Sequence, residues 1–558
     1  MHIATGFISL QTAIYFVIVP LVMVMKIFGP NFQTLFLAGS LIASCQKSPV
    51  ALTVNQSATA AIDGITVNGN ISSGNSFKNM LGVNAFEWNV LTADGSQIDE
   101  SKLKVIKQFN GVRHYLDWGR IEAQQGKYTF NPAHSGNWNF DAMYQRLKIE
   151  NVDLLVCLKT CPDWLLQTYP GDQRDAENVP MPYGSDKSQP ASYTLQAKAA
   201  FQFAARYGSN KAVDPNLLKI DNSQRWNGDG INEVKIGLGL IKYIECDNER
   251  DKWWKGDKAH QTAQEYAANL SAFYDGNKGV LGKDVGVKNA DPNMIVVMAG
   301  LAAADPAYVA AMIDWCKQNR GYKTDGSVNL CFDVVNYHLY TNNNKSNGGT
   351  ATQGLAPELS EAAQVAQSFV SLATTYHLPV WITEAGFDVN PQSPQRALVV
   401  GSRDQTLTQA DWLLRTALLY ARNGIQKLFF FELFDGNVSS STQYASSGLV
   451  LPGLTNRPAE NFLLQAKNLI GNYAYQKTVN SDPIVDVYTL GSKIIYSLVV
   501  PDQKQRTANY SLALPGTNNV IIHTLSATTA ITTDEKKALT NGKLDLIVTE
   551  TPVFVEVI

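Results

Sequence analysis

Short apolar runs alternate with amphipathic segments through the middle of the chain. The runs are rich in β-branched and aromatic residues and nearly continuous in hydrophobicity, which is typical of strands buried on both faces of a parallel sheet. Between them, apolar residues recur with helical spacing, as at Phe140, Met143, Tyr144 and Leu147. The runs that we expect to be strands are residues 81–86, 111–118, 153–159, 234–245, 294–299, 333–338, 379–383 and 427–431.

The order of these elements predicts an α/β fold. Eight strands with helices between them are the count of a (β/α)8 TIM barrel, which we place at residues 79–473. An open doubly wound sheet is the alternative, and it is disfavoured because no glycine-rich phosphate loop follows the first run. Beyond residue 473, strand-like runs are separated by turn residues, with one helical pattern at 533–539. This predicts a small C-terminal antiparallel β-sandwich at residues 474–558.

The first 44 residues are largely apolar and differ from the rest of the chain. One apolar run, residues 7–25, has the length of a membrane span, and a second, residues 32–43, has the length of a signal-peptide core. The second run leads into Leu-Ile-Ala-Ser-Cys at Cys45, which resembles the lipobox of bacterial lipoproteins. The alternative is a true N-terminal membrane anchor followed by an unrelated cysteine.

The lipobox resemblance implies a leader and a lipid anchor. Residues 1–44 would be the leader, with residues 1–24 an over-extended start, and Cys45 would be the lipidated residue. Residues 45–78, rich in small polar residues, would form a tether, unless residues 65–67 add a strand to the sandwich. We therefore expect an extracytoplasmic protein anchored to a bacterial membrane, either in the periplasm or at the cell surface.

Charge and cysteine content exclude some classes of function. The chain has 46 Lys and Arg against 49 Asp and Glu and a pI near 6.2, which argues against nucleic-acid binding. Apart from Cys45, five cysteines remain, at spacings that match no zinc site. We expect them to be buried apolar residues, with a Cys157–Cys161 or a Cys161–Cys246 disulfide as the alternative. Neither His-x-His nor His-Glu-x-x-His occurs, so we expect no catalytic metal and no cofactor.

Two carboxylates follow predicted strands of the barrel. The fourth run leads into Cys-Asp-Asn-Glu249, and the seventh leads into Thr-Glu384-Ala-Gly. Because the chemistry of a (β/α)8 barrel lies at the C-terminal ends of its strands, we expect Glu249 and Glu384 to face one cavity. Cleavage of a glycosidic bond needs such a pair: one group protonates the leaving oxygen and the other attacks or activates water.

A set of motifs resembles the clan A glycoside hydrolases, which are retaining enzymes with a (β/α)8 barrel. Each motif is short, but together they follow the order of the clan along strands two, four, six and seven. The motifs are Asn248-Glu249, His338-x-Tyr340, Thr383-Glu-x-Gly386, Arg113 in Val-Arg-His-Tyr, Trp118-x-x-Ile-Glu leading to Tyr-x-Phe130, and the terminal Thr551-Pro-Val-Phe-Val-Glu-Val557. The resemblance implies a glycosidase that cleaves β-linked oligo- or polysaccharides.

The resemblance also implies roles for individual residues. Glu249 would be the general acid/base, with Glu245 and Asp247 as alternatives. Glu384 would be the nucleophile, and the alternative is a structural carboxylate paired with Arg113.

Three further residues would assist these carboxylates, together with Arg113. Arg113 would keep Glu384 ionised by its charge, and Tyr340 would hydrogen-bond Glu384. Asn248 would hold the sugar 2-hydroxyl, and His338 would line the subsite of the transferred sugar.

Aromatic residues near the predicted site are candidates for sugar binding. Trp253 and Trp254 follow Glu249 closely, and Trp164 follows the third run; packing at the barrel rim is the alternative for all three. The clan often has a tryptophan platform after strand eight, where this chain has Phe431 and Glu432. We expect Phe431 to be the platform or Glu432 to bond a sugar hydroxyl. A glycan-binding lipoprotein with a degenerate barrel and a purely structural anchor are the rival functions.

Overall fold

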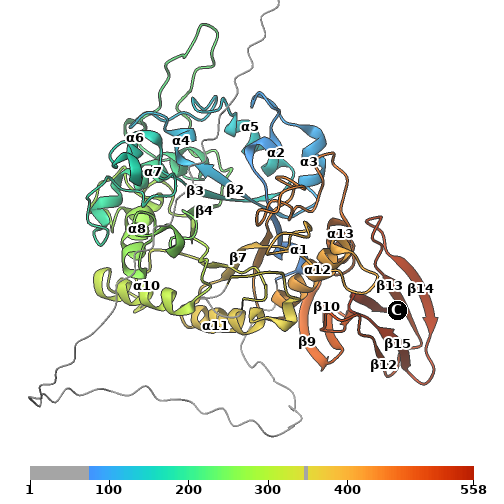
Figure 1. Cartoon of the computed structure of the whole chain (residues 1–558). Helices are drawn as coiled ribbons and strands as arrows, with labels where there is room; N and C mark the ends of the chain where they lie inside the picture. Colours follow the sequence, from blue (N-terminus) through green and yellow to red (C-terminus); the bar gives the residue numbers. More distant parts are fainter. Residues whose placement is uncertain (1–74, 345–349) are drawn as a thin grey trace, which may run out of the picture. The chain divides into compact units, whose positions relative to one another are not determined.

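The structure is a computed structural model that describes residues 75–344 and 350–558 (Figure 1). The predicted leader, Cys45 and nearly all of the predicted tether lie outside the described residues. Within the described ranges, no helix combines the length and the hydrophobicity that crossing a bilayer requires.

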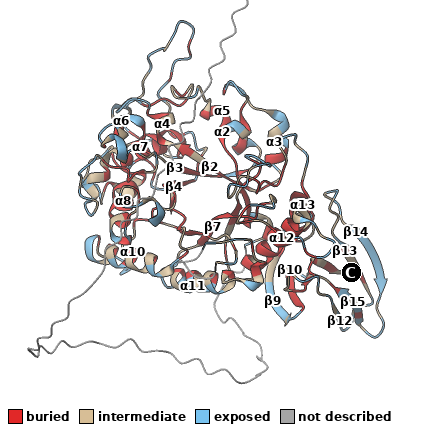
Figure 2. Cartoon of the chain, viewed as in Figure 1, coloured by how far each residue is buried: buried red, intermediate tan, exposed pale blue. Residues whose placement is uncertain are grey.

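Eight parallel strands form the barrel that the hydrophobic pattern predicts. Hydrogen bonds join them in the order β5-β4-β3-β2-β1-β8-β7-β6. Parallel bridges from Val297 to Val334 and from Leu301 to Tyr337 connect the two ends of this sheet. The labelled barrel strands are mostly buried, as Figure 2 shows in red. The strands are β1 (Leu81–Asn84), β2 (Gly111–Asp117), β3 (Asp153–Lys159), β4 (Tyr243–Cys246), β5 (Ile295–Met298), β6 (Val335–His338), β7 (Val380–Ala385) and β8 (Lys427–Phe430).

Helices surround the strands, and local sequence signals set their ends. Thr262 and Glu265 form a capping box at the start of α8, and Gly276 ends this helix with a left-handed φ of 63°. Asp305 caps α10, whose first position is Pro306. The longer helices are α3 (Glu100–Ile106), α5 (Phe140–Ile149), α7 (Thr194–Tyr207), α8 (Ala263–Asp275), α10 (Pro306–Asn319), α11 (Ala362–Thr375), α12 (Gln405–Arg422) and α13 (Pro458–Ile470). The single-turn helices are α1 (Phe77–Met80), α2 (Glu87–Val90), α4 (Trp118–Ile121), α6 (Asp163–Leu166) and α9 (Val287–Ala290).

The fourth strand is shorter than the sequence pattern predicts. Within the predicted run at 234–245, Gly237 and Gly239 take positive φ values of 63° and 65°, which interrupt an extended strand. The backbone N–H groups of Gly237 and Leu238 bond to carbonyl oxygens at the end of α7 instead. This part of the run therefore packs beside α7, and β4 begins only at Tyr243.

The C-terminal residues form the predicted antiparallel sandwich. A six-stranded sheet has the order β14-β13-β16-β11-β10-β9, and β12 pairs with β15 in a second sheet. Val485, Leu498, Leu512 and Val555 belong to one apolar cluster that includes both sheets. The strands are β9 (Ala474–Ser481), β10 (Ile484–Leu490), β11 (Lys493–Val499), β12 (Ala508–Ala513), β13 (Asn519–Thr524), β14 (Thr533–Ala538), β15 (Lys543–Val548) and β16 (Val553–Val557).

The predicted helical pattern at 533–539 is wrong. This segment is β14, an exposed strand at the edge of the six-stranded sheet, and it pairs with β13 in antiparallel register. Backbone pairing with β13 outweighs the weak local preference of these residues for a helix.

Buried ion pairs join the barrel to the sandwich. Arg422 of α12 donates from Nη2 to Asp486 Oδ2 on β10 at 2.7 Å. Arg403 donates from Nη2 to Glu550 Oε2, also at 2.7 Å. Both carboxylates are almost fully buried, so these contacts belong to the interior of the interface between the two structural parts.

The five described cysteines are buried and free, which confirms their prediction as buried residues. The alternative of a Cys157–Cys161 or Cys161–Cys246 disulfide is therefore wrong. The Sγ atom of Cys157 donates to the carbonyl oxygen of Asp247, and that of Cys161 donates to the carbonyl oxygen of Asn178.

Candidate active site

Glu249 and Glu384 lie together at the C-terminal ends of the barrel strands. Glu384 belongs to β7, and Glu249 lies in the loop that follows β4. One carboxylate oxygen from each, together with a ring nitrogen of His338, lie within 4.8 Å of one another. The structure thus brings together the two carboxylates that the sequence analysis placed after the fourth and seventh strands.

Arg113 occupies the centre of the site and is fully buried. Its Nη1 donates to Glu384 Oε1 at 2.8 Å, and its Nη2 donates to Asn248 Oδ1 at 2.8 Å. Its Nε and Nη2 also donate to both oxygens of Glu245, at 2.6 and 3.0 Å. One guanidinium thus fixes residues from β4, the loop after it and β7 in a single network.

Three donors, two on β2 and one just after β6, hold Glu384 as a carboxylate. Tyr115 and Arg113 of β2 donate to Oε1, and Tyr340, which follows β6, donates to Oε2 at 2.9 Å. Burial alone would raise the pKa of Glu384, but the charges of His338 and Arg113 and these hydrogen bonds lower it to about 2. Glu384 is therefore ionised at neutral pH.

His338 connects the two carboxylates. Its Nδ1 lies 2.8 Å from Glu249 Oε1 and 3.6 Å from Glu384 Oε2, and its Nε2 lies 2.9 Å from Thr383 Oγ1. Burial lowers the pKa of His338, but Glu384 and Glu249 together raise it above its ordinary value. The imidazole thus tends toward the protonated form, in which both ring nitrogens donate hydrogen bonds.

The loop after β4 gives Glu249 a different environment from the other two acidic candidates. Glu245 is fully buried and paired with Arg113, and Asp247 accepts bonds from the Asn248 backbone N–H and from Arg250. The Glu249 side chain is 19% exposed, so it alone of the three can reach both His338 and a ligand from solvent. Of these three carboxylates, Glu249 is therefore the one that both contacts His338 and remains partly accessible to solvent.

The backbone of this loop is strained and well anchored. Asp247 and Glu249 have φ values of 69° and 50°, in the left-handed region that residues with side chains rarely occupy. The carboxylate of Asp251 accepts hydrogen bonds from the N–H groups of Ala302 and Ala303, beyond the end of β5. Such conformations persist only where the surroundings impose them, and here they set the direction of Glu249.

Asn248 is positioned by the same network. Its amide oxygen accepts from Arg113 Nη2 at 2.8 Å and lies 3.3 Å from the Tyr115 hydroxyl oxygen. With the oxygen occupied, the amide NH2 is the group that remains to donate to a ligand hydroxyl.

Phe431 and Glu432 follow β8; the first packs among aromatic rings and the second is a buried carboxyl group. The ring of Phe431 packs against Phe86, Tyr115 and Tyr444, with centroids 6.2 to 6.5 Å apart. Glu432 is 8% exposed. Burial and the nearby Asp435 raise its pKa to about 8, so its carboxyl group is largely protonated at neutral pH. A neutral carboxyl can donate a hydrogen bond as well as accept one.

The three predicted tryptophans have unequal surroundings. Trp164 is only partly exposed; its Nε1 donates to the Glu122 carbonyl at 2.9 Å, and its ring packs edge-on against Trp118. Its packing role is therefore evident, and its role in sugar binding stays a prediction. Trp253 and Trp254 are 52% and 51% exposed, on a short turn four residues beyond Glu249.

Tyr115 and Tyr444 are site residues that the sequence interpretation did not single out. Tyr115 is two residues beyond Arg113 on β2, so alternation along the strand places both on the same face. That signal was present in the sequence. Tyr444 packs against Tyr340 with centroids 4.3 Å apart, and it belongs to an irregular loop whose sequence has no pattern that indicates this contact.

Glu249, His338 and Glu384 are also the group of described residues whose geometry could hold a metal ion. The same atoms are already engaged: His338 bonds to Glu249 and Thr383, and Arg113 supplies a positive charge to Glu384. These interactions account for the cluster by themselves, because they place positive groups beside both carboxylates.

No protein-family model matches the chain, and no curated protein matches it. Solved structures do match in fold. A family 39 glycoside hydrolase from the gut symbiont Bacteroides cellulosilyticus WH2 has a TM-score of 0.58 at 16% identity, over 86% of this chain and 82% of that chain. A glucosidase from Croceicoccus marinus has a TM-score of 0.50 at 12% identity, over 87% of this chain and 97% of that chain. Likenesses at these identities show a shared fold.

Proposed function

We propose that the protein is a retaining glycoside hydrolase that cleaves β-linked oligo- or polysaccharides. The observation that carries the proposal is the placement of Glu249 and Glu384, each of which has a carboxylate oxygen within 4.8 Å of the other in one cluster at the C-terminal ends of the barrel strands. Retaining glycosidases place their carboxyl groups about 5–5.5 Å apart, whereas inverting enzymes need about 6.5–9.5 Å for a water molecule. The shared fold with two named glycosidases supports the same proposal.

Glu384 has the properties of the nucleophile. Its pKa of about 2 keeps it ionised, and Arg113, Tyr115 and Tyr340 fix both of its oxygens. In the first step its free electron pair forms a bond to the anomeric carbon while the bond to the leaving oxygen breaks. Glu249 gives its proton to that oxygen, and the sugar remains as an ester on Glu384.

The second step reverses these roles. A water molecule attacks the anomeric carbon, Glu249 takes the proton of this water, and the ester bond breaks to restore the Glu384 carboxylate. Asn248, oriented by Arg113, donates to the sugar 2-hydroxyl in both steps. The neutral carboxyl group of Glu432 and the ring of Phe431 line the same subsite beside Glu384.

The decisive experiment compares three isosteric variants. Glu249→Gln and Glu384→Gln are each expected to abolish turnover of aryl β-glycosides and polysaccharides, and Glu535→Gln on exposed β14 serves as the control. Circular dichroism checks that each variant is folded. Azide added to Glu384→Gly is expected to give an α-glycosyl azide, which identifies the nucleophile. Full activity in either active-site variant rejects the proposal.

A non-catalytic glycan-binding protein is the rival function. The exposed Trp253 and Trp254 suit glycan binding in either case. A 2-fluoro glycoside inactivator separates the two functions, because an enzyme forms a stable ester on Glu384 that mass spectrometry of peptides detects. Binding of glycans by the wild-type protein without such labelling or turnover favours the rival.

We also propose, from the sequence alone, that Cys45 carries a lipid that anchors the protein outside the cytoplasm of a bacterium. The support is the lipobox-like Leu-Ile-Ala-Ser-Cys sequence. Labelled palmitate fed to expressing bacteria is expected to enter the wild-type protein and not Cys45→Ala. Equal labelling of both proteins, or labelling of neither, contradicts the anchor.

A further inference from the structure

An exposed tryptophan lies beside the candidate active site, at the end of β1. Trp88 belongs to the single-turn helix α2 and is 49% exposed. Its ring stacks on that of Phe86, with centroids 4.8 Å apart and planes inclined by 29°. The indole thus has one face supported by Phe86, and about half of the residue remains accessible to solvent.

A series of aromatic contacts connects Trp88 to the nucleophile. Phe86 lies 5.4 Å from Tyr115 between ring centroids, and 6.3 Å from Phe431. Tyr115 donates its hydroxyl hydrogen to Glu384. Two ring-to-ring contacts therefore separate Trp88 from the tyrosine that touches the Glu384 carboxylate, so Trp88 is a near neighbour of the sugar that Glu384 would bind.

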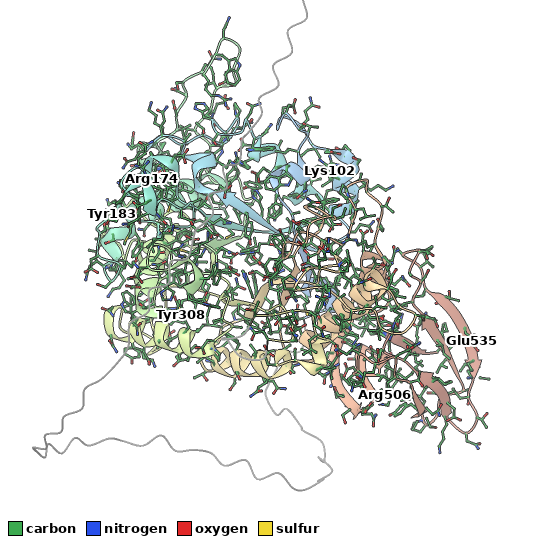
Figure 3. All side chains as sticks on the ribbon, in the orientation of Figure 1. Lys102, Arg174, Tyr183, Tyr308, Arg506 and Glu535 are labelled. Carbon is green, nitrogen blue, oxygen red and sulfur yellow. The ribbon has the colours of Figure 1, made fainter. Side chains whose placement is uncertain are left out.

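The backbone that carries Trp88 is anchored on both sides. The buried carboxylate of Glu87 lies 3.1 Å from His114 Nε2, and the Asn89 side chain accepts from the Phe86 N–H at 2.8 Å. Lys102 of α3, labelled in Figure 3, donates to the Trp88 carbonyl at 3.0 Å. A ring presented from a fixed backbone loses little conformational freedom on binding, which is the physical basis of a preorganised platform.

Trp88 and the exposed pair Trp253 and Trp254 follow different strands of the barrel. Trp88 follows β1 and connects through Phe86 and Tyr115 to the nucleophile. Trp253 and Trp254 follow β4, directly after the proposed acid/base Glu249. In a retaining mechanism the sugar bound to Glu384 belongs to the non-reducing side of the cleaved bond, and the group protonated by Glu249 belongs to the other side.

We propose that Trp88 binds a second sugar ring, next to the one attached to Glu384 and on its non-reducing side. This inference rests on the proposed glycosidase function and deepens it. Its consequence is a substrate class: β-linked glycans with at least two sugars before the cleaved bond, rather than single terminal sugars. The apolar face of a sugar ring stacks on the open face of the indole, and its hydroxyl groups remain in water.

The test varies substrate length and the Trp88 ring together. The probes are 4-nitrophenyl β-xyloside against β-xylobioside, and 4-nitrophenyl β-glucoside against β-cellobioside. Trp88→Ala is expected to lower kcat/KM about tenfold on the disaccharide that the wild type prefers, and to change the monosaccharide by less than about twofold. Trp88→Phe, which keeps a ring, is expected to lose less on the disaccharide than Trp88→Ala.

Trp226→Ala is the matched control, because Trp226 is similarly exposed, at 55%, and stacks on Arg225 in a separate segment. It is expected to leave both probe lengths unchanged. An equal effect of Trp88→Ala on both lengths, or no effect on either, overturns the Trp88 inference while activity of the wild type still supports the proposed function.

A second measurement covers the case in which the wild type cleaves none of the probes. That result counts against the proposed function, and calorimetric binding of xylohexaose and cellohexaose then tests Trp88 alone. Weaker binding by Trp88→Ala than by Trp226→Ala supports a sugar site at Trp88, and equal binding by both overturns it.

Discussion

Arg113 and Glu245 form a fully buried ion pair within the candidate active site. Nε donates to Oε2 at 2.6 Å and Nη2 donates to Oε1 at 3.0 Å, with neither side chain exposed to solvent. Glu245 also accepts from the Gly300 N–H and from the Asn336 amide. Because Arg113 bonds to Glu384 as well, Glu245 acts on Glu384, the proposed nucleophile, through the arginine that both carboxylates share.

Removal of Glu245 is expected to destabilise the fold. Glu245→Ala leaves the Arg113 guanidinium with one carboxylate instead of two, in a position closed to solvent. Breaking a buried pair in this way costs about 3–5 kcal/mol of unfolding free energy. Urea unfolding of the variant measures this loss, and Glu245→Gln, which can still accept from Arg113, is expected to lose less. A loss below about 1 kcal/mol for Glu245→Ala contradicts the prediction.

The Tyr115 hydroxyl is expected to control the acid limb of the activity profile. Its hydrogen bond is one of the interactions that lower the pKa of Glu384, after the charges of His338 and Arg113. Tyr115→Phe raises this pKa, so Glu384 is protonated, and activity is lost, at a higher pH than in the wild type. The lost bond to a charged group is also expected to lower kcat about tenfold or more.

Measurement of kcat/KM from about pH 2 to pH 7 checks this shift, since the acid limb follows the ionisation of the free enzyme and the wild-type limb is expected near pH 2. Tyr322→Phe is the matched control, because Tyr322 is 62% exposed and away from the strands that carry the site. An acid limb that does not move in Tyr115→Phe contradicts the assignment of Glu384 as the group that must be ionised.

Glu432 is expected to make the folded protein less stable as the pH rises. Burial and Asp435 raise its pKa to about 8, against an ordinary value near 4.5. Between these two values the folded state holds a proton that the unfolded state releases, so the free energy of unfolding falls with rising pH. The contribution of Glu432 is complete below about pH 4.5 and is lost as the pH passes about 8.

The side chain in Glu432→Gln is neutral at every pH, so this variant lacks the contribution of Glu432 to the pH dependence of stability. Asp411 and Glu460, whose pKa values burial raises to about 7, add to the same trend in the wild type. The free energy of unfolding, obtained from melting curves at pH 4.5 and at pH 8, is therefore expected to fall less in Glu432→Gln than in the wild type. The two decreases are expected to differ by at least about 1 kcal/mol. Parallel curves contradict the prediction.

A buried ion pair between the barrel and the sandwich can be compared with an exposed one inside the sandwich. Asp486 is 1% exposed and accepts from Arg422 and Thr478, whereas Asp482 is half exposed in its pair with Arg506. Asp486→Ala is expected to cost about 3 kcal/mol or more, because it leaves Arg422 without its buried partner. Asp482→Ala is expected to cost less than about 1 kcal/mol. Thermal unfolding of both variants measures the contrast, and equal losses contradict it.

The barrel and the two carboxylates could be predicted from sequence because each depends on local pattern. Continuous apolar runs indicate strands buried on both faces, and acidic residues at strand ends meet at one edge of a parallel barrel. The pattern failed in two places. At Gly237 a glycine takes a left-handed conformation that ends the predicted strand, and in β14 backbone pairing with β13 produces a strand where a helix was predicted.

The rest of the site depends on contacts between distant segments. The spacing of Glu245 and Glu249 does not reveal which of them Arg113 holds, because that follows from the left-handed backbone at Asp247 and Glu249. Trp88 also looks like any aromatic residue after a strand. Its exposure and its support by Phe86 become visible only when β1, β2 and β8 are placed side by side.

The charged edge strand β14 affects whether two molecules of this protein can associate through their sheets. Its residues Asp534, Glu535, Lys536 and Lys537 are exposed on the last strand of the six-stranded sheet. A strand from another molecule that paired there would bring its own backbone against four charges and strip water from them, which is unfavourable. Charges on this edge of the sheet therefore disfavour edge-to-edge pairing between copies of the protein.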